Sequence, residues 1–333
     1  MASFHHRAFG LRIDSDAPIS GLPETTAEVP GELGIHMGTL PDAFDPTDPA
    51  IRELWHSESD RSDDVDAVTL SASADGKWLI LQYADGTRFV LDRGGTGIWA
   101  TWPARESADS AATYLLGPVI GFVLRLRGLT CFHASSVVIA DRVILMLGPA
   151  GSGKSSIAAA LALRGHRVTG DDIAVVQPDG GRWLVLPSIP GVRLWDDMVE
   201  TLLGRSDALP LLAPGWEKRQ LDLRTAPAGF RSDVAVPLGA IYVLSQPDPS
   251  GTLVSERLRP RDAFLSLVAN TYANVLLTPA LRRAEFDALS AIVQTVPVWR
   301  VGVPDKGRGF DQFCARVEAV DAASDFGPGA PDG

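Results

Sequence analysis

Lysine is scarce in this 333-residue chain, which carries it only at Lys77, Lys154, Lys218 and Lys306. The formal net charge is −11 and there is no basic tract, so nucleic acid is not expected as a main partner. No uncharged apolar run reaches the roughly 18 residues of a membrane span. The opening stretch MASFHHRAFG lacks the apolar segment of a secretory signal. These absences predict a cytoplasmic protein without a membrane segment.

Cysteine is also rare. Cys131 and Cys314 lack metal-ligand spacing, and each lies in an apolar run, which predicts buried free thiols in a reducing compartment. The acidity is uneven, because residues 1–110 hold 19 acidic and 8 basic side chains whereas residues 111–333 hold 22 of each. The acidic part either attracts a basic partner or forms a solubilising face.

The clearest motif is GPAGSGKSS at residues 148–156, with the spacing G-x-x-x-x-G-K-[ST] between the apolar run RVILML and an alanine-rich helical pattern. Backbone N–H groups of such a loop and the following helix N-terminus bind phosphates. Lys154 would lie across the β- and γ-phosphates of a nucleotide, and the Ser155 hydroxyl would bind Mg²⁺. The alternative is a fortuitous glycine-rich turn. The predicted nucleotide contacts in this loop are Gly148, Pro149, Ala150, Gly151, Ser152, Gly153, Lys154, Ser155 and Ser156.

A second motif is RGHRVTGDD at residues 164–172, where a short strand pattern ends in Asp171 and Asp172. These acids follow Lys154 by 17 and 18 residues, which is the length of one helix and a return strand, so we expect them beside the phosphates. One carboxylate would accept a proton from an incoming hydroxyl and the other would order Mg²⁺. The alternative is a surface pair that caps a turn.

Taken together and in this order, FHASSVVI, GPAGSGKSS and RGHRVTGDD resemble the core of the HPr kinase/phosphorylase family and its HPr-kinase-like relatives, over about residues 113–300. That family phosphorylates a protein serine with ATP. The resemblance implies that His133 is the histidine that assists at the active site, although a packed strand histidine is the alternative. It implies that Lys154 and Ser155 are the phosphate lysine and metal hydroxyl. Asp171 would be the base and Asp172 its acidic partner.

Other stretches extend or depart from this resemblance. Lys218 and Arg219, in GWEKRQLDL, are candidate phosphate or nucleotide contacts, with a solvated basic pair as the alternative. LPSIPGVRLWDD lacks the metal-binding glutamate that the family carries after its Asp-Asp pair, and Asp196 or Asp197 would be a weak substitute. We therefore expect neither the reverse phosphorylase reaction nor HPr as substrate. The N-terminal part resembles stand-alone relatives from lasso and other ribosomal peptide clusters, which modify a precursor serine. The family's hexamers make a homo-oligomer one option.

The pattern of strands and helices predicts an α/β fold, with a P-loop kinase core and a mixed central sheet flanked by helices. This core spans residues 129–320, after a smaller α+β region at 1–128 and before a disordered tail at 321–333. The expected local elements are a hairpin at 78–92, a helix at 107–128, loop and short helix at 45–66, strands at 130–140 and 142–148, and helices at 262–277 and 279–296.

The leading functional hypothesis is an ATP- and Mg²⁺-dependent kinase that acts on a serine of a peptide or small protein, with a lasso precursor as one candidate. Two alternatives stay open. One is a small-metabolite kinase with an enclosed acceptor pocket, and the other is a nucleotide-binding regulator without catalysis.

Overall fold

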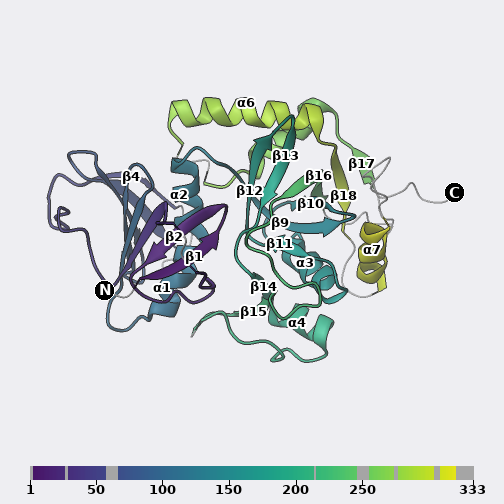
Figure 1. Cartoon of the computed structure of the whole chain (residues 1–333), viewed down its shortest axis with the longest axis horizontal. Helices are drawn as coiled ribbons and strands as arrows, with labels where there is room; N and C mark the ends of the chain where they lie inside the picture. Colours follow the sequence, from purple (N-terminus) through teal and green to yellow (C-terminus); the bar gives the residue numbers. More distant parts are fainter. Residues whose placement is uncertain are drawn as a thin grey trace. The chain divides into compact units, whose positions relative to one another are not determined.

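The computed structural model describes residues 3–26, 29–57, 67–213, 215–245, 255–273, 277–303 and 308–319. The chain divides into two compact units, Met1–Arg127 and Gly128–Gly333 (Figure 1). The tail predicted at 321–333 lies outside the described residues. No helix in the described parts of the chain has both the length and the apolar character needed to cross a membrane.

The first unit contains an eight-stranded sheet in the order β1-β2-β3-β8-β7-β6-β5-β4. The hairpin predicted at 78–92 is confirmed, because β6 and β7 pair antiparallel from Trp78 opposite Asp92. The strands are β1 (Phe4–Ala8), β2 (Leu11–Ser15), β3 (Leu33–Met37), β4 (Arg52–His56), β5 (Val68–Ala72), β6 (Trp78–Tyr83), β7 (Arg88–Asp92) and β8 (Gly97–Thr101).

Of the loop and short helix predicted at 45–66, the loop is confirmed at 45–51, whereas the helix is wrong where the structure describes the chain, because β4 is a strand at the edge of this sheet. Its five residues are mostly exposed, so it has no alternation of buried and polar positions that would mark a strand. Residues 58–66 lie outside the described residues.

The helix predicted at 107–128 is confirmed, with a break in the middle. Ser107 caps it by accepting a hydrogen bond from the Ser110 N–H, and α1 (Ala108–Tyr114) leads through a π-helical turn, η1 (Leu115–Val119), into α2 (Ile120–Leu126). Gly117 has non-helical dihedral angles and Pro118 follows it, so the regular hydrogen-bonding ladder is interrupted there. The ring of Tyr114 stacks on Tyr83 of β6, with centroids 4.0 Å apart.

The second unit is built on a mixed sheet, as predicted, and this sheet has eight strands. The path is β10-β9-β12-β13-β16-β18-β17, with β11 paired to β9, and an additional parallel pairing of β10 with β16 closes five of these strands into a small barrel. The strands are β9 (Thr130–Ile139), β10 (Arg142–Leu147), β11 (Val168–Gly170), β12 (Ile173–Asp179), β13 (Arg182–Leu186), β16 (Val236–Ser245), β17 (Ser255–Arg257) and β18 (Val298–Gly302).

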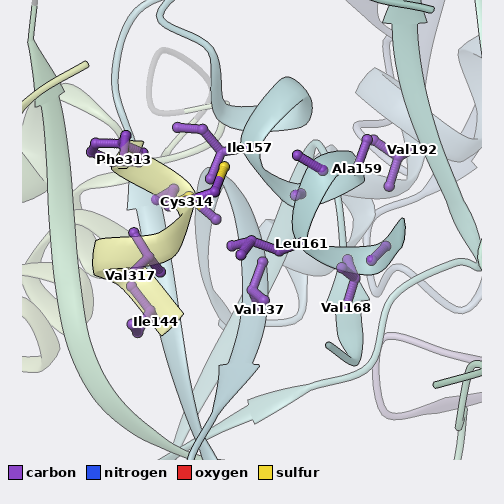
Figure 2. Packing of buried hydrophobic residues seen from close by; sticks show 14 of the residues in the cluster. Val137, Ile144, Ile157, Ala159, Leu161, Val168, Val192, Phe313, Cys314 and Val317 are labelled. Carbon is purple, nitrogen blue, oxygen red and sulfur yellow. The ribbon is translucent and has the colours of Figure 1, made fainter. Parts of the chain in front are cut away.

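Helices cover this sheet through two hydrophobic clusters. In the first, α3 (Lys154–Leu163) and α7 (Arg308–Glu318) pack on Val137 of β9 and Ile144 of β10 (Figure 2). In the second, α5 (Pro260–Ala269) and α6 (Pro279–Thr295) pack on the alternate residues of the same strands. Both cysteines are buried free thiols, as predicted, and Cys314 belongs to the first cluster.

The helix predicted at 262–277 is shorter than expected. α5 ends at Ala269, and residues 274–276 lie outside the described residues. Asn270 follows the helix and directs its side-chain oxygen to another segment of the chain, which ends the helical pattern. The helix predicted at 279–296 is confirmed by α6.

A short two-stranded sheet was not predicted. β14 (Gly191–Trp195) pairs antiparallel with β15 (Lys218–Asp222), and α4 (Asp196–Leu203) follows β14 directly. Val192 and Leu194 point into the first hydrophobic cluster, which fixes this small sheet beside α3.

Gly170, the last residue of β11, lies against Ser188. A Cβ on Gly170 would sit 2.1 Å from the Ser188 hydroxyl oxygen and 2.8 Å from its Cβ, which is closer than packed atoms allow. Glycine is therefore required here by space, and the residues that follow it, Asp171 and Asp172, depend on its position.

We predict that Gly170→Ala lowers the free energy of unfolding of the second unit by about 1–3 kcal/mol, because the added methyl group overpacks this contact. Ser188→Gly removes both clashing atoms, so the double variant should recover most of the loss. Urea unfolding of the four proteins measures the coupling. Strictly additive losses would show that the clash is not the cause.

Candidate functional site

The glycine-rich loop connects β10 to the N-terminus of α3. Gly148 and Gly153 have φ angles of 149° and 92°, which favour glycine. A Cβ on Gly148 would also come within 3.1 Å of the Leu244 carbonyl oxygen on β16, the parallel neighbour of β10. The sheet therefore holds the loop close to its neighbouring strand, and the loop delivers Lys154 and Ser155 to the first turn of α3.

Lys154 is buried and folds back over the loop that precedes it. Its Nζ donates hydrogen bonds to the carbonyl oxygens of Gly148, at 2.7 Å, and Pro149, at 3.0 Å. Burial lowers the pKa of this ammonium, and the charges of Asp171 and Asp172 oppose that shift. The predicted lysine and the predicted acid pair thus lie within electrostatic reach of one another.

Asp171 is buried where three elements meet. Its Oδ1 accepts hydrogen bonds from Ser135 Oγ on β9, at 2.5 Å, and from Ser155 Oγ on α3, at 3.0 Å. Its Oδ2 accepts one from the backbone N–H of Arg193 on β14, at 3.2 Å. Burial raises the pKa of Asp171, and the neighbouring charge of Asp172 raises it further against the effect of these donors.

Asp172 turns its carboxylate toward different partners. Its φ of 72° is a left-handed conformation that aspartate tolerates better than most residues. Oδ1 lies 3.0 Å from His133 Nδ1 and Oδ2 lies 3.5 Å from Arg193 Nη1. Burial acts to raise the pKa of Asp172, but the hydrogen bond from His133 and the charge of Arg193 outweigh it and hold the pKa below its ordinary value.

The strand pairing explains why the two acids diverge. β11 and β12 pair with successive stretches of the same strand, β9, so that Asp171 and Asp172 form the step between them. Ile173, the first residue of β12, lies opposite His133. A histidine two residues before Ser135 on β9 therefore reaches the second acid, while Ser135 reaches the first.

The two predicted basic residues, Lys218 and Arg219, have different partners. Arg219 Nε lies 2.6 Å from Asp196 Oδ1, and its Nη1 donates to the Leu209 carbonyl oxygen. Asp196, considered as a weak substitute for a metal-binding glutamate, is thus paired with an arginine. Lys218 Nζ lies 4.9 Å from the centroid of the Trp195 ring, and its charge acts on the pKa of both Lys154 and Asp172.

The sequence did not single out Ser135, Arg193 or Asn270. The Asn270 side-chain oxygen accepts a hydrogen bond from the Gly148 N–H, and its backbone oxygen accepts one from the His133 N–H, both at 2.9 Å. Ser135 had a weak signal, because it lies two residues from His133 on one strand. Arg193 and Asn270 had none, since their roles arise only when distant segments meet.

The donor set suits a nucleotide with Mg²⁺. Mg²⁺ uses one or two protein oxygens together with phosphate oxygens, and the Ser155 hydroxyl, the neighbouring Asp171 carboxylate and the carboxylate of the next residue, Asp172, are oxygens of this kind. The Ser152 hydroxyl oxygen in the loop is buried and has no hydrogen-bond partner within the described structure. Among the described residues, no three His, Cys, Asp or Glu side chains form a metal cluster by themselves.

No protein-family model matches this sequence, and no curated protein matches it. Among solved structures, the HPr(Ser) kinase/phosphatase from Coxiella burnetii is similar over 56% of this chain and 91% of that chain, with 15% identity and a TM-score of 0.31. This likeness is distant.

We predict that Asn270→Ala loosens the glycine-rich loop, because the Gly148 N–H loses its acceptor. An unsatisfied buried donor costs about 1–3 kcal/mol, so amide hydrogen exchange over residues 148–153 should accelerate and the free energy of unfolding should fall. Gln294→Ala, which removes an exposed amide from α6, is the control. Unchanged exchange in the loop would contradict the assigned role of Asn270.

Proposed function

We propose that this protein is an ATP- and Mg²⁺-dependent kinase that transfers the γ-phosphate to a serine hydroxyl of a peptide or small protein. One observation carries the proposal: Ser155, at the end of the glycine-rich loop, hydrogen-bonds Asp171 at 3.0 Å. A phosphate-binding element and a buried carboxylate thus converge at one point. Phosphoryl transfer needs such positioning more than any covalent chemistry from the protein.

The side chains divide the work by their environments. The loop N–H groups and Lys154 bind the phosphates and offset charge on the transferred group. The raised pKa of Asp171 suits a proton acceptor, whereas the lowered pKa of Asp172 keeps that carboxylate ionised as a metal ligand. Bound Mg²⁺ would neutralise phosphate charge, with Ser155 and Asp172 as its protein ligands. His133 and Arg193 hold Asp172 in place.

The proposed phosphate transfer forms one bond, breaks one bond and moves one proton. The acceptor serine oxygen forms a bond to the γ-phosphorus while the bond from that phosphorus to the β,γ-bridging oxygen breaks, and ADP leaves. The serine proton passes to the Asp171 carboxylate. The precursor of a ribosomally made peptide, such as a lasso peptide, is the candidate acceptor that the sequence resemblance suggests.

We predict that Asp171→Asn lowers phosphate transfer at least a hundredfold, because the proton acceptor is lost. The assay follows label from γ-labelled ATP into a mixture of serine peptides, with binding of a fluorescent ADP analogue measured in parallel. Asp179→Asn, an exposed acid paired with Arg182 at the β12–β13 turn, is the matched control and should leave transfer unchanged.

Two results would contradict the proposed kinase. Wild-type protein that binds nucleotide but labels neither peptides nor small metabolites would be a regulator. Label found only in metabolites would make the protein a small-molecule kinase.

We predict that Ser135→Ala moves the acid limb of the rate-against-pH profile to higher pH. Ser135 donates to the ionised carboxylate of Asp171, so its loss raises the pKa of Asp171 further, and a higher pH is needed to ionise the base. Ser136→Ala is the matched control, because the neighbouring hydroxyl donates to the Gly170 carbonyl oxygen instead. Equal shifts in both variants would contradict the assignment.

A further inference from the structure

The small β14–β15 sheet has one buried face and one outer face. Val192 and Leu194 are 0% and 2% exposed and belong to the first hydrophobic cluster. Because side chains alternate along a strand, the outer face carries Arg193 and Trp195 of β14. Their cross-strand partners on β15 are Gln220 and Lys218, which complete what we call the β14–β15 outer face: Arg193, Trp195, Lys218 and Gln220.

This outer face starts at the candidate site. The Arg193 guanidinium lies 3.5 Å from Asp172, and the Arg193 N–H donates to Asp171. Trp195 follows two residues later on the same face, roughly 7 Å farther along an extended strand. An extended peptide alongside β14 has the same repeat. If the serine of such a peptide lies beside Arg193, the peptide residue two positions from that serine therefore lies beside Trp195 and Lys218.

The charges on this face favour an acidic ligand. Arg193 already faces Asp172, and the adjacent Arg219 is paired with Asp196. Within the part of the chain that the structure describes, Lys218 makes no salt bridge; its ammonium rests over the Trp195 ring, and its charge acts on Asp172 only from a longer distance. A carboxylate from a ligand could form an ion pair with the Lys218 ammonium.

Trp195 has the character of a binding residue. It is 51% exposed, and it is the only tryptophan among the large apolar side chains that the described structure leaves exposed. Tryptophan is enriched among the residues that dominate protein–protein binding energy. It lies directly opposite Lys218 in the strand pairing and two residues from Arg193, which contacts the candidate site.

We propose that the β14–β15 outer face binds the acceptor as an extended peptide, with an acidic side chain two residues from the serine placed against Lys218 and with Trp195 packed beneath it. This inference rests on the proposed kinase function and names the class of acceptor. It assigns Lys218 to the acceptor and not to the nucleotide.

The test uses a degenerate peptide library with a fixed serine, γ-labelled ATP and sequencing of the labelled products. Wild-type protein should enrich Asp or Glu two residues from the serine. Lys218→Glu should lose that preference and enrich Lys or Arg at the same position. Trp195→Ala should lower kcat/KM for the preferred peptide about tenfold, as loss of a central aromatic contact does. Lys77→Glu, an exposed lysine paired with Asp75, should match wild type.

The outcomes separate the two proposals. Labelled peptides without an acidic preference, or a preference unaltered by Lys218→Glu, would overturn this inference and leave the kinase function standing. No labelled peptide at all from wild type would overturn both. If Trp195→Ala weakens binding of a fluorescent ADP analogue as much as it lowers peptide use, the outer face holds the nucleotide and the inference is wrong.

Discussion

A buried carboxylate governs how the second unit is assembled. Asp171 has almost no exposed surface, and a charge in that position is tolerated only when its oxygens are satisfied by donors. The donors come from three separate segments: Ser135 on β9, Ser155 on α3 and the Arg193 backbone on β14. Satisfying one side chain therefore fixes the first turn of the helix, the central strand and the small sheet relative to one another. The hydrogen bonds that build the candidate site therefore also hold these three elements together.

The two neighbouring acids acquire different properties because the chain turns between them. A left-handed residue at Asp172 sends its carboxylate to His133 and Arg193, while Asp171 remains inside with hydroxyl and amide donors. The pKa of Asp171 is therefore raised, mainly by burial, whereas the pKa of Asp172 is lowered by its basic partners despite burial. Adjacent carboxylates on a regular strand would point to opposite faces of the sheet. The step between β11 and β12 keeps both of them near the glycine-rich loop instead.

Local sequence signals predicted the elements that depend on local physics. The glycine-rich loop between β10 and α3, the 78–92 hairpin and the capped helix at 107–128 all follow from periodicity and turn chemistry. The edge strand β4 escaped prediction because its residues are mostly exposed. β14 and β15 escaped because even their nearest paired residues, Trp195 and Lys218, lie far apart in the sequence, with no hairpin turn to mark the pairing. The roles of Arg193 and Asn270 could not be predicted from the sequence for another reason. Their partners lie 21 and 122 residues away in sequence, and only tertiary pairing brings them to the site.

The exposed β14–β15 outer face bears on the kind of acceptor that the proposed kinase would take. Small ligands are usually held in concave pockets that bury most of their surface. Here the element that leads away from Asp172 is one face of a two-stranded sheet, with an aromatic ring half exposed and a cation resting on it. Such a face contacts a chain along its length better than it encloses a metabolite. Because the same strand also donates its Arg193 N–H to Asp171, a ligand that moves β14 would alter the environment of the proposed base directly. In the proposed kinase, acceptor binding and proton acceptance would thereby be coupled through a single strand.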